Sequence, residues 1–267
     1  MLTQEQVNHF ETFGFLILRQ AFIPEEMEQI NAAANELWDG KRQRNPDADD
    51  LGIAPFIELS PALAWLAEDD RLYPAMEQLL GSGFIWSGSE GQNSVISPNP
   101  RHDWHADRPG ARELGYRRIK IMLYLSPMKK EEGALRIIPG SHRDPLHTEL
   151  HPFQAVHGQK DPTFFGQDGA EVPCYALETQ PGDAAVFSQS LFHGVYGKVP
   201  DRRYIALKFA ARPTSDAHLA SLYCYSPYAF KPHEAFVKSD SRCIRGMVDG
   251  LVQLGEKAAG LVPEYYP

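Results

Sequence analysis

Hydrophobic positions in the first 80 residues recur mostly at helical spacing. Thr3 and Gln6 have the spacing of a capping box, and they predict a short helix that stops at Gly14. Residues 15 to 18 form an apolar run that is typical of a buried strand. Pro24 is placed to open a second helix, whose apolar positions recur until Gly40.

The predicted helix that starts at Pro24 should therefore end before Gly40, and the polar residues 41 to 50 predict a loop. A third helical stretch is expected to start at Ser60-Pro61, and a fourth to end at Leu80-Gly81.

From about Phe84 onward the pattern changes to short apolar runs separated by Gly and Pro. The predicted strands cover residues 117–125, 134–138, 175–179, 184–187 and 203–210. Because no helical pattern separates most of these runs, they favour a mainly β fold with flanking helices, built as an antiparallel sandwich or barrel. Residues 141–173, which are rich in His, Gly, Pro and Gln, predict a long insertion.

We interpret residues 1–267 as a single domain. Residues 1–83 are its mostly helical N-terminal part, residues 84–212 its β core and residues 213–267 a C-terminal extension.

Composition narrows the classes of partner. The formal net charge is -9, from 26 basic and 35 acidic residues, which argues against a nucleic acid or an anionic membrane as the partner. No apolar run is long enough for a membrane span, and the N-terminus lacks the pattern of a signal peptide. The three cysteines have no CxxC spacing. We expect a soluble, cytoplasmic protein that acts on a small molecule as a monomer or a homodimer.

A His-x-Asp motif carries the candidate chemistry. Residues two apart in a strand share a face, so His105 and Asp107 can point to the same side. A third ligand can come from a distant strand across a barrel, and His193 follows a turn and an apolar run. Two imidazoles and one carboxylate are the ligand set that binds iron(II) on one face and leaves the other positions open.

The open positions could take a bidentate 2-oxo acid and dioxygen. The far carboxylate of such an acid requires a fixed cation, for which the planar fork of an arginine is well suited. Arg202 and Arg203 point to opposite faces of their predicted strand. Arg202 shares its face with polar and small residues, so we assign Arg202 to the barrel interior. The same alternation separates Lys120, Met122 and Tyr124 from the apolar face of their strand.

Several further motifs occur in a fixed order around these residues. A Phe-x-x-x-Gly-Phe element spans residues 10 to 15, and Trp104 to Asp107 read Trp-His-Ala-Asp. The run Gly-Ala-Leu-Arg-Ile-Ile-Pro-Gly-Ser-His fills residues 133 to 142, and a Pro-Gly-Asp turn follows at 181 to 183. With His193 and Arg202 after them, these motifs resemble the phytanoyl-CoA dioxygenase family of iron(II)- and 2-oxoglutarate-dependent oxygenases over nearly the whole chain.

The resemblance implies a double-stranded β-helix, which is a jelly-roll, cupin-like core. It also implies Fe²⁺ bound by His105, Asp107 and His193, with 2-oxoglutarate bound by the iron and by Arg202, and with dioxygen as the other co-substrate. His102 occupies the place of a glutamine that reaches 2-oxoglutarate in some similar enzymes, although a regular strand would turn it away from His105. Where many relatives carry a serine near the co-substrate, this chain has Val195.

The expected reaction is hydroxylation of an unactivated C–H bond in a small metabolite, with release of succinate and CO2. Relatives that lost the carboxylate are halogenases, whereas Asp107 is present here. The residues that we expect on the substrate side are Trp104, Arg108, Lys120, Met122 and Tyr124. Two alternatives are a non-oxidative metalloenzyme on the same barrel, which would need no 2-oxo acid site, and a noncatalytic binding protein, which would have a broken triad. The substrate itself does not follow from the sequence.

Overall fold

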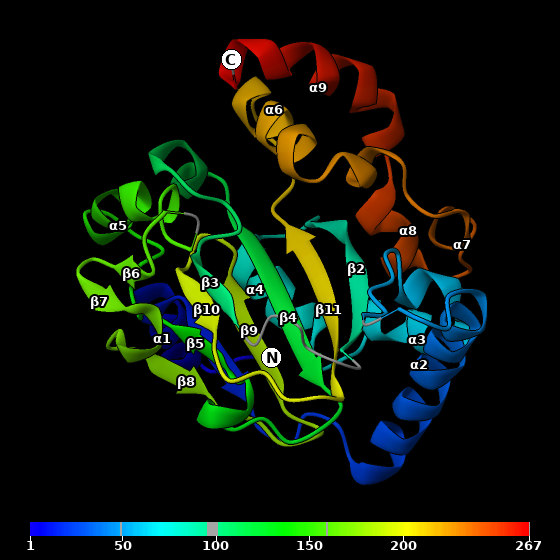
Figure 1. The fold of residues 1–267 in the computed structure, drawn as a ribbon. Coiled ribbons are helices and arrows are strands. Elements are labelled where there is room, and N and C mark those ends of the chain that lie inside the picture. Colours follow the sequence, from blue (N-terminus) through cyan, green and yellow to red (C-terminus); the bar gives the residue numbers. More distant parts are fainter. Residues whose placement is uncertain (49, 95–100, 159, 267) are drawn as a thin grey trace.

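Two antiparallel sheets form the centre of the protein (Figure 1). The computed structural model describes residues 1–48, 50–94, 101–158 and 160–266. The larger sheet has the order β1-β9-β4-β11-β2, and the smaller one the order β3-β10-β5-β8. The strands of the larger sheet are β1 (Phe15–Leu18), β9 (Ala184–Ser188), β4 (Arg118–Tyr124), β11 (Arg202–Ala210) and β2 (Ile85–Ser94). Those of the smaller sheet are β3 (His102–His105), β10 (His193–Val195), β5 (Leu135–Ile137) and β8 (Tyr175–Leu177).

Helices surround the sheets on several sides (Figure 1). The α-helices are α1 (Gln4–Phe13), α2 (Pro24–Arg44), α3 (Pro61–Ala64), α4 (Tyr73–Leu80), α5 (Leu146–Gln154), α6 (Asp216–Tyr225), α7 (Glu234–Val237), α8 (Arg242–Val248) and α9 (Leu251–Tyr265). The 3-10 helices are η1 (Ile57–Leu59), η2 (Trp65–Ala67), η3 (Ala111–Gly115), η4 (Lys130–Glu132), η5 (Gly169–Glu171) and η6 (Pro227–Phe230). The helical share of the chain is larger than the expected mainly β fold implies. In the described part of the chain, no helix combines the length and the apolar character that crossing a bilayer requires.

The strand predictions for the core are confirmed with small shifts at their ends. The alternation predicted along β4 is also confirmed. Ile119, Ile121 and Leu123 pack into the main hydrophobic core, whereas Met122 and Tyr124 pack into a separate cluster between the sheets. That cluster also contains Leu135 and other residues of the smaller sheet, which shows that the two sheets face each other.

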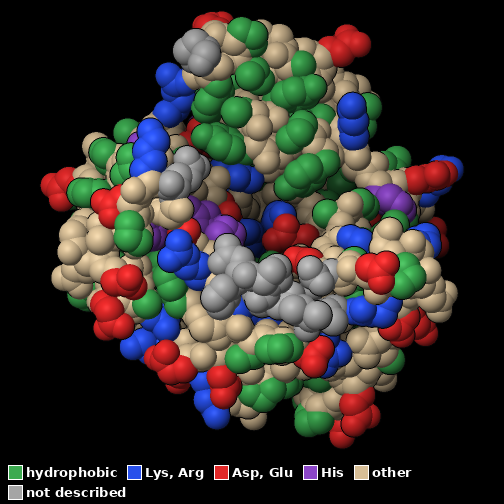
Figure 2. Space-filling view, viewed as in Figure 1, with side chains coloured by type: hydrophobic (Ala, Val, Ile, Leu, Met, Phe, Trp, Pro, Cys, Tyr) green, Lys and Arg blue, Asp and Glu red, His purple; other side chains and the backbone are tan. Residues whose placement is uncertain are grey.

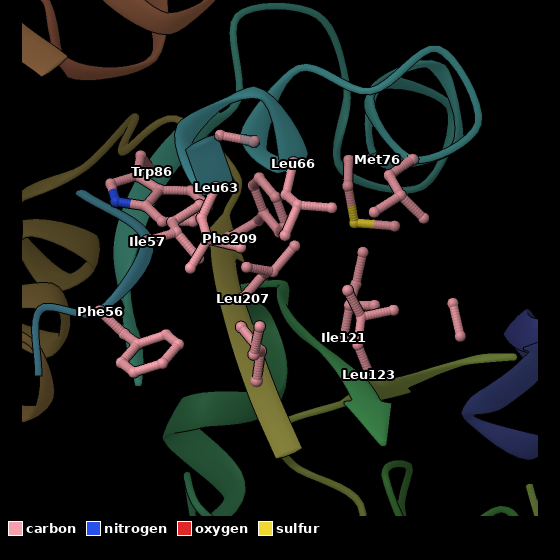
Figure 3. Close-up of a cluster of buried hydrophobic side chains, with 14 of the residues drawn as sticks. Phe56, Ile57, Leu63, Leu66, Met76, Trp86, Ile121, Leu123, Leu207 and Phe209 are labelled. Carbon is pink, nitrogen blue, oxygen red and sulfur yellow. The ribbon is translucent and has the colours of Figure 1, made fainter. Parts of the chain in front are cut away.

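The main hydrophobic core lies on the other face of the larger sheet, against the N-terminal helices. Figure 3 shows side chains of β4 and β11 meeting those of α3, η2 and α4. Leu207 and Phe209 of β11 are fully buried there. This packing covers one face of the sheet with helices and leaves the opposite face to line the interior between the sheets.

Both ends of α1 follow the prediction, but the end of α2 does not. Thr3 and Gln6 form the capping box, and Gly14 ends α1 in the left-handed conformation. The prediction that Gly40 ends the second helix is wrong, because α2 continues to Arg44. Glycine inside a helix costs only about 1 kcal/mol, and the basic residues of the last turn favour the helix C-terminus.

The predicted insertion contains structure of its own. Residues 141–173 include α5 and a two-stranded hairpin of β6 (Thr163–Phe164) and β7 (Gln167–Asp168). Leu150 and Phe164 from this segment pack with Trp104 on the outer face of the smaller sheet. The insertion therefore covers that sheet from outside.

We expect Leu207→Ala to lower the free energy of unfolding by about 2–5 kcal/mol, because it removes fully buried methyl groups and leaves a cavity. Chemical denaturation measures the change. Leu59→Ala is the matched control, because Leu59 is 44% exposed and its truncation should cost less than about 1 kcal/mol. Equal losses in the two variants would contradict this assignment of the core.

Candidate active site

His105, Asp107 and His193 meet at one place between the sheets. His105 ends β3 and is the cross-strand partner of His193, which begins β10. Asp107 Oδ1 lies 3.7 Å from His105 Nε2 and 3.9 Å from His193 Nε2. One donor atom from each of the three residues falls within 4.8 Å of the others, which is close enough for all three to bind one metal ion.

Backbone carbonyls fix the orientation of both imidazole rings. His105 Nδ1 lies 2.7 Å from the carbonyl oxygen of Asp103, and His193 Nδ1 lies 2.8 Å from that of Leu191. A ring nitrogen that faces a carbonyl must carry the proton, so each Nε2 presents its lone pair towards Asp107. Burial lowers the pKa of His193 to about 3, which keeps this ring neutral at pH 7. Two oriented imidazoles and one carboxylate fit a divalent first-row transition metal such as iron(II).

Lys120 forms a half-buried ion pair with the carboxylate of this cluster. Its Nζ lies 2.6 Å from Asp107 Oδ2, on the side away from the imidazoles. Burial raises the pKa of Asp107, but Lys120 and the two histidines outweigh burial and hold this pKa well below its usual value. Asp107 is therefore ionised, with one oxygen turned to the histidines and the other to the ammonium group.

Arg202 lines the same cavity, which has a volume of about 290 Å³. Its side chain is buried, with Nε donating to the carbonyl of Gly133 at 2.8 Å and Nη2 donating to the hydroxyl of Tyr124 at 3.0 Å. The guanidinium also lies over the rings of Tyr124 and Tyr204, at 5.2 and 5.0 Å from their centroids. These contacts hold a cation at a fixed place in the wall of the cavity.

Arg203 lies on the opposite face of β11. Its Nη1 donates to Asn35 Oδ1 of α2 at 3.0 Å. The alternation along the strand thus separates the two arginines as the sequence analysis expected.

His102 also lines the cavity, because β3 is irregular. His105 pairs with His193 and His102 pairs with Val195, so four residues of β3 oppose three of β10. This register shift brings His102 to the same side as His105, and the two rings stack with centroids 4.2 Å apart. Burial and the neighbouring His105 lower the pKa of His102 to about 4.

The five expected substrate residues fall into three groups. Lys120 and Met122 line the cavity, whereas Tyr124 lies behind Arg202. Trp104 and Arg108 do not line this cavity.

Trp104 and Arg108 point elsewhere for different reasons. Trp104 follows strand alternation to the outer face of its sheet, where Nε1 donates to the carbonyl of Gly169 at 2.7 Å. Arg108 reaches the C-terminal helices, where it bonds Ser226 Oγ at 3.1 Å and lies over the ring of Tyr225.

Polar residues of β2 were missed by the sequence analysis. Glu90, Gln92 and Ser94 line the cavity at alternate positions of this strand. Their spacing of two was the available signal, but the surrounding Gly, Ser and Asn residues masked it. Lys198 was also not expected in the wall, whereas Tyr204 lies on the strand face that the sequence analysis assigned to the interior with Arg202. Val195 places an apolar side chain in the same wall. Figure 2 shows a hollow at the centre of this face, in which histidine, basic and acidic side chains gather.

Comparison with known proteins adds independent findings. The family described as phytanoyl-CoA dioxygenase (PhyH) matches residues 10–198. A dioxygenase, cdmD, from Talaromyces verruculosus is 38% identical over 76 residues, which are 28% of this chain and 20% of that protein. The ectoine dioxygenase of Bordetella bronchiseptica is 26% identical over 156 residues, which are 53% of this chain and 50% of the relative. The matches thus span a fifth to a half of the length of these curated relatives.

Solved structures with a similar fold include HygX from Streptomyces hygroscopicus with iron bound, at a TM-score of 0.62 and 18% identity, covering 79% of this chain and 87% of that one. HygX with nickel and 2-oxoglutarate bound gives a TM-score of 0.60 at 20% identity, with 79% and 88% covered. The epimerase SnoN, in complex with Fe³⁺, alpha ketoglutarate and nogalamycin RO, gives a TM-score of 0.58 at 15% identity, with 78% and 83% covered. At these identities the likeness concerns the fold.

We expect His193→Ala and Asp107→Ala each to weaken Ni²⁺ binding at least about 100-fold, because each variant lacks one of the three ligands. Loss of a residue that only hydrogen-bonds to a metal ligand already lowers metal affinity about 10–100-fold. Isothermal titration calorimetry without 2-oxoglutarate measures the affinity. His102→Ala is the matched control, since it removes an imidazole from the same cavity but not from the cluster. A loss in His102→Ala as large as in His193→Ala would contradict the assigned ligand set.

Proposed function

The chain belongs to the phytanoyl-CoA dioxygenase family, and on that premise we propose that it is an Fe²⁺- and 2-oxoglutarate-dependent dioxygenase. The observation that carries the proposal is one cavity that holds both the His105–Asp107–His193 cluster and the buried Arg202. Neither group alone is specific. Together they offer three ligands for a metal and a fixed cation for the far end of a dicarboxylate.

In this proposal His105, Asp107 and His193 hold the iron. The chemistry of bound iron is the activation of dioxygen, coupled to the oxidative decarboxylation of 2-oxoglutarate to succinate and CO2. The two backbone carbonyls that accept from Nδ1 of the histidines keep both Nε2 lone pairs aimed at the metal. Lys120 holds the remaining oxygen of Asp107, which fixes the plane of the carboxylate.

Arg202 binds the carboxylate of 2-oxoglutarate that is remote from the iron. Tyr124 and Gly133 accept from Nη2 and Nε of Arg202, and neither bond uses Nη1. The side chain is thereby held in one rotamer, so little conformational entropy is lost when the co-substrate binds. In this proposal His102, whose ring stacks on that of His105, contacts the same co-substrate beside the iron. Val195 supplies apolar contact where many relatives have a hydroxyl.

The proposed reaction converts a C–H bond, O2 and 2-oxoglutarate into a C–OH group, succinate and CO2. Asp107 retains the carboxylate ligand, and this favours hydroxylation over halogenation. The structural neighbour SnoN is described as an epimerase. The alternative to hydroxylation is therefore a reaction such as epimerisation at the same carbon. The substrate in this proposal is a small molecule, for which HygX with hygromycin B bound provides a precedent among the structural neighbours.

We further propose that the two facing sheets are the double-stranded β-helix of a jelly-roll, cupin-like fold, and that residues 1–267 act as one domain. The antiparallel pairing and the shared core between the sheets support this assignment. The C-terminal helices α6 and α9, which pack on each other, would then be an extension at the mouth of the barrel.

The direct test is 2-oxoglutarate turnover. Protein with Fe²⁺ and dioxygen should form succinate from 2-oxoglutarate, slowly without substrate and faster with an accepted one from a panel of small metabolites. Asp107→Ala should reduce succinate formation at least about 100-fold, because it removes the charged iron ligand. Asp50→Ala, which removes a carboxylate from the wall of the same cavity, should retain most of it. Succinate formation by Asp107→Ala at the original rate would exclude the triad.

Arg202→Met should weaken 2-oxoglutarate binding about 10- to 200-fold, because a hydrogen bond to a charged group contributes about 1.5–3 kcal/mol. Arg203→Met is the matched control and should stay within about twofold, since Arg203 faces α2. Calorimetry on the Ni²⁺-loaded protein measures both affinities. The reverse order of effects would contradict the assignment of Arg202 to the co-substrate.

A further inference from the structure

A second chamber lies beside the metal cavity, along β2, the edge strand of the larger sheet. It has a volume of about 280 Å³, and its walls include Trp86 and Gly88 of β2, Lys208 of β11, Tyr228 of η6, and Ala54. These residues come from four separate parts of the chain. The chamber therefore exists only because η6 and the loop around residue 54 close over the end of the sheet.

The surface of this chamber is mostly apolar. Trp86 and Tyr228 contribute aromatic rings, and a Cβ on Gly88 would lie 2.5 Å from the ring of Tyr228, so the glycine lets this ring approach the strand. Glu58 also lines the chamber, but its carboxylate already accepts from Trp86 Nε1 at 2.8 Å and from Ser89 Oγ. A ligand body in this chamber would therefore meet mostly apolar surface, although Lys208, Lys231 and His233 also line the walls.

An ion pair joins the chamber to the metal cavity. Lys208 lines the chamber, Glu90 lines the cavity, and Lys208 Nζ lies 2.6 Å from Glu90 Oε2. Lys120, the cross-strand partner of Lys208, also interacts electrostatically with Glu90 and is itself paired with Asp107. We call these three residues, Lys120, Glu90 and Lys208, the charged seam.

The charged seam contains more positive than negative charge. Two ammonium groups share the single carboxylate of Glu90, and when Asp107 also binds a metal, its carboxylate neutralises less of the charge of Lys120. Asp50 and Lys198, which line the same cavity, carry opposite charges that offset each other. An excess positive charge at a half-buried place favours a ligand with one negative group.

We infer that the primary substrate is an amphiphilic carboxylate, with an apolar body of ring size in the chamber and its carboxylate at the charged seam. This inference rests on the proposed function, because the seam gains its excess charge when Asp107 binds a metal. It specifies a substrate class that neither the cluster nor Arg202 determines.

The test uses two probes with the same ring and opposite charge, 1-naphthylacetate and 1-naphthylmethylamine. Calorimetry on protein loaded with Ni²⁺ and 2-oxoglutarate should give at least about tenfold tighter binding of 1-naphthylacetate. Lys208→Met should remove most of this preference. Equal binding of the two probes, or a preference for the amine, would overturn the assignment of the charge.

A second variant tests the location. Ala54→Trp fills the chamber from an exposed position and should weaken the binding of 1-naphthylacetate at least about tenfold. Ala62→Trp, also at an exposed alanine, should leave this binding unchanged. Both variants should bind Ni²⁺ and 2-oxoglutarate like the original protein, which excludes misfolding as the cause. Equal affinities for 1-naphthylacetate in the two variants would overturn the assignment of the apolar body to the chamber.

The same titrations separate failure of this inference from failure of the proposed function. If 2-oxoglutarate does not bind but Ala54→Trp still weakens the binding of 1-naphthylacetate, the proposed co-substrate is wrong, whereas the assignment of the chamber as the substrate site is supported. If 2-oxoglutarate binds normally but neither the charge of the probe nor Ala54→Trp changes the affinity for the probe, the chamber is not the substrate site and the proposed function is unaffected.

Discussion

The antiparallel pairing of β3 with β10 is the constraint on which the candidate site depends. It sets His105 opposite His193, and the carbonyls of Asp103 and Leu191 then turn the two Nε2 atoms towards Asp107. A shift of the pairing by one residue would move one imidazole to the outer face, where Trp104 now packs. The hydrophobic packing around Trp104 therefore also favours the observed register, because a shifted register would expose Trp104 or bury an imidazole among apolar side chains.

The larger sheet supplies the charges that surround the cluster. Its inner face carries Lys120 on β4, Arg202 and Lys208 on β11, and Glu90 on β2, while its outer face is packed against helices. Burying so many charges is costly unless each has a partner. Lys120 pairs with Asp107, Lys208 pairs with Glu90, and Arg202 is held by Tyr124 and Gly133. The site is thus preorganised, with these three cations held in place before any ligand binds.

Strand alternation made much of this arrangement predictable from the sequence. It separated Lys120 and Met122 from the core face of β4, and Arg202 from Arg203, because a period of two is a property of any regular strand. It also explains why Trp104 packs outside the cavity, since a residue next to a ligand in a strand faces the other way. His102 could not be placed, because a register shift between β3 and β10 overrides the regular period. β2 was missed because its polar inner face and its glycines give no alternation of apolar and polar residues. Its extended conformation depends on pairing with β11, which the sequence of β2 alone does not reveal.

X-ray absorption at the iron edge, on protein loaded with Fe²⁺ and 2-oxoglutarate without oxygen, tests the central claim most directly. We predict two imidazole ligands per iron with oxygen ligands otherwise and no sulfur, and one imidazole in His193→Ala if iron is retained. An unchanged spectrum in His193→Ala, or sulfur among the ligands of the original protein, would contradict the account.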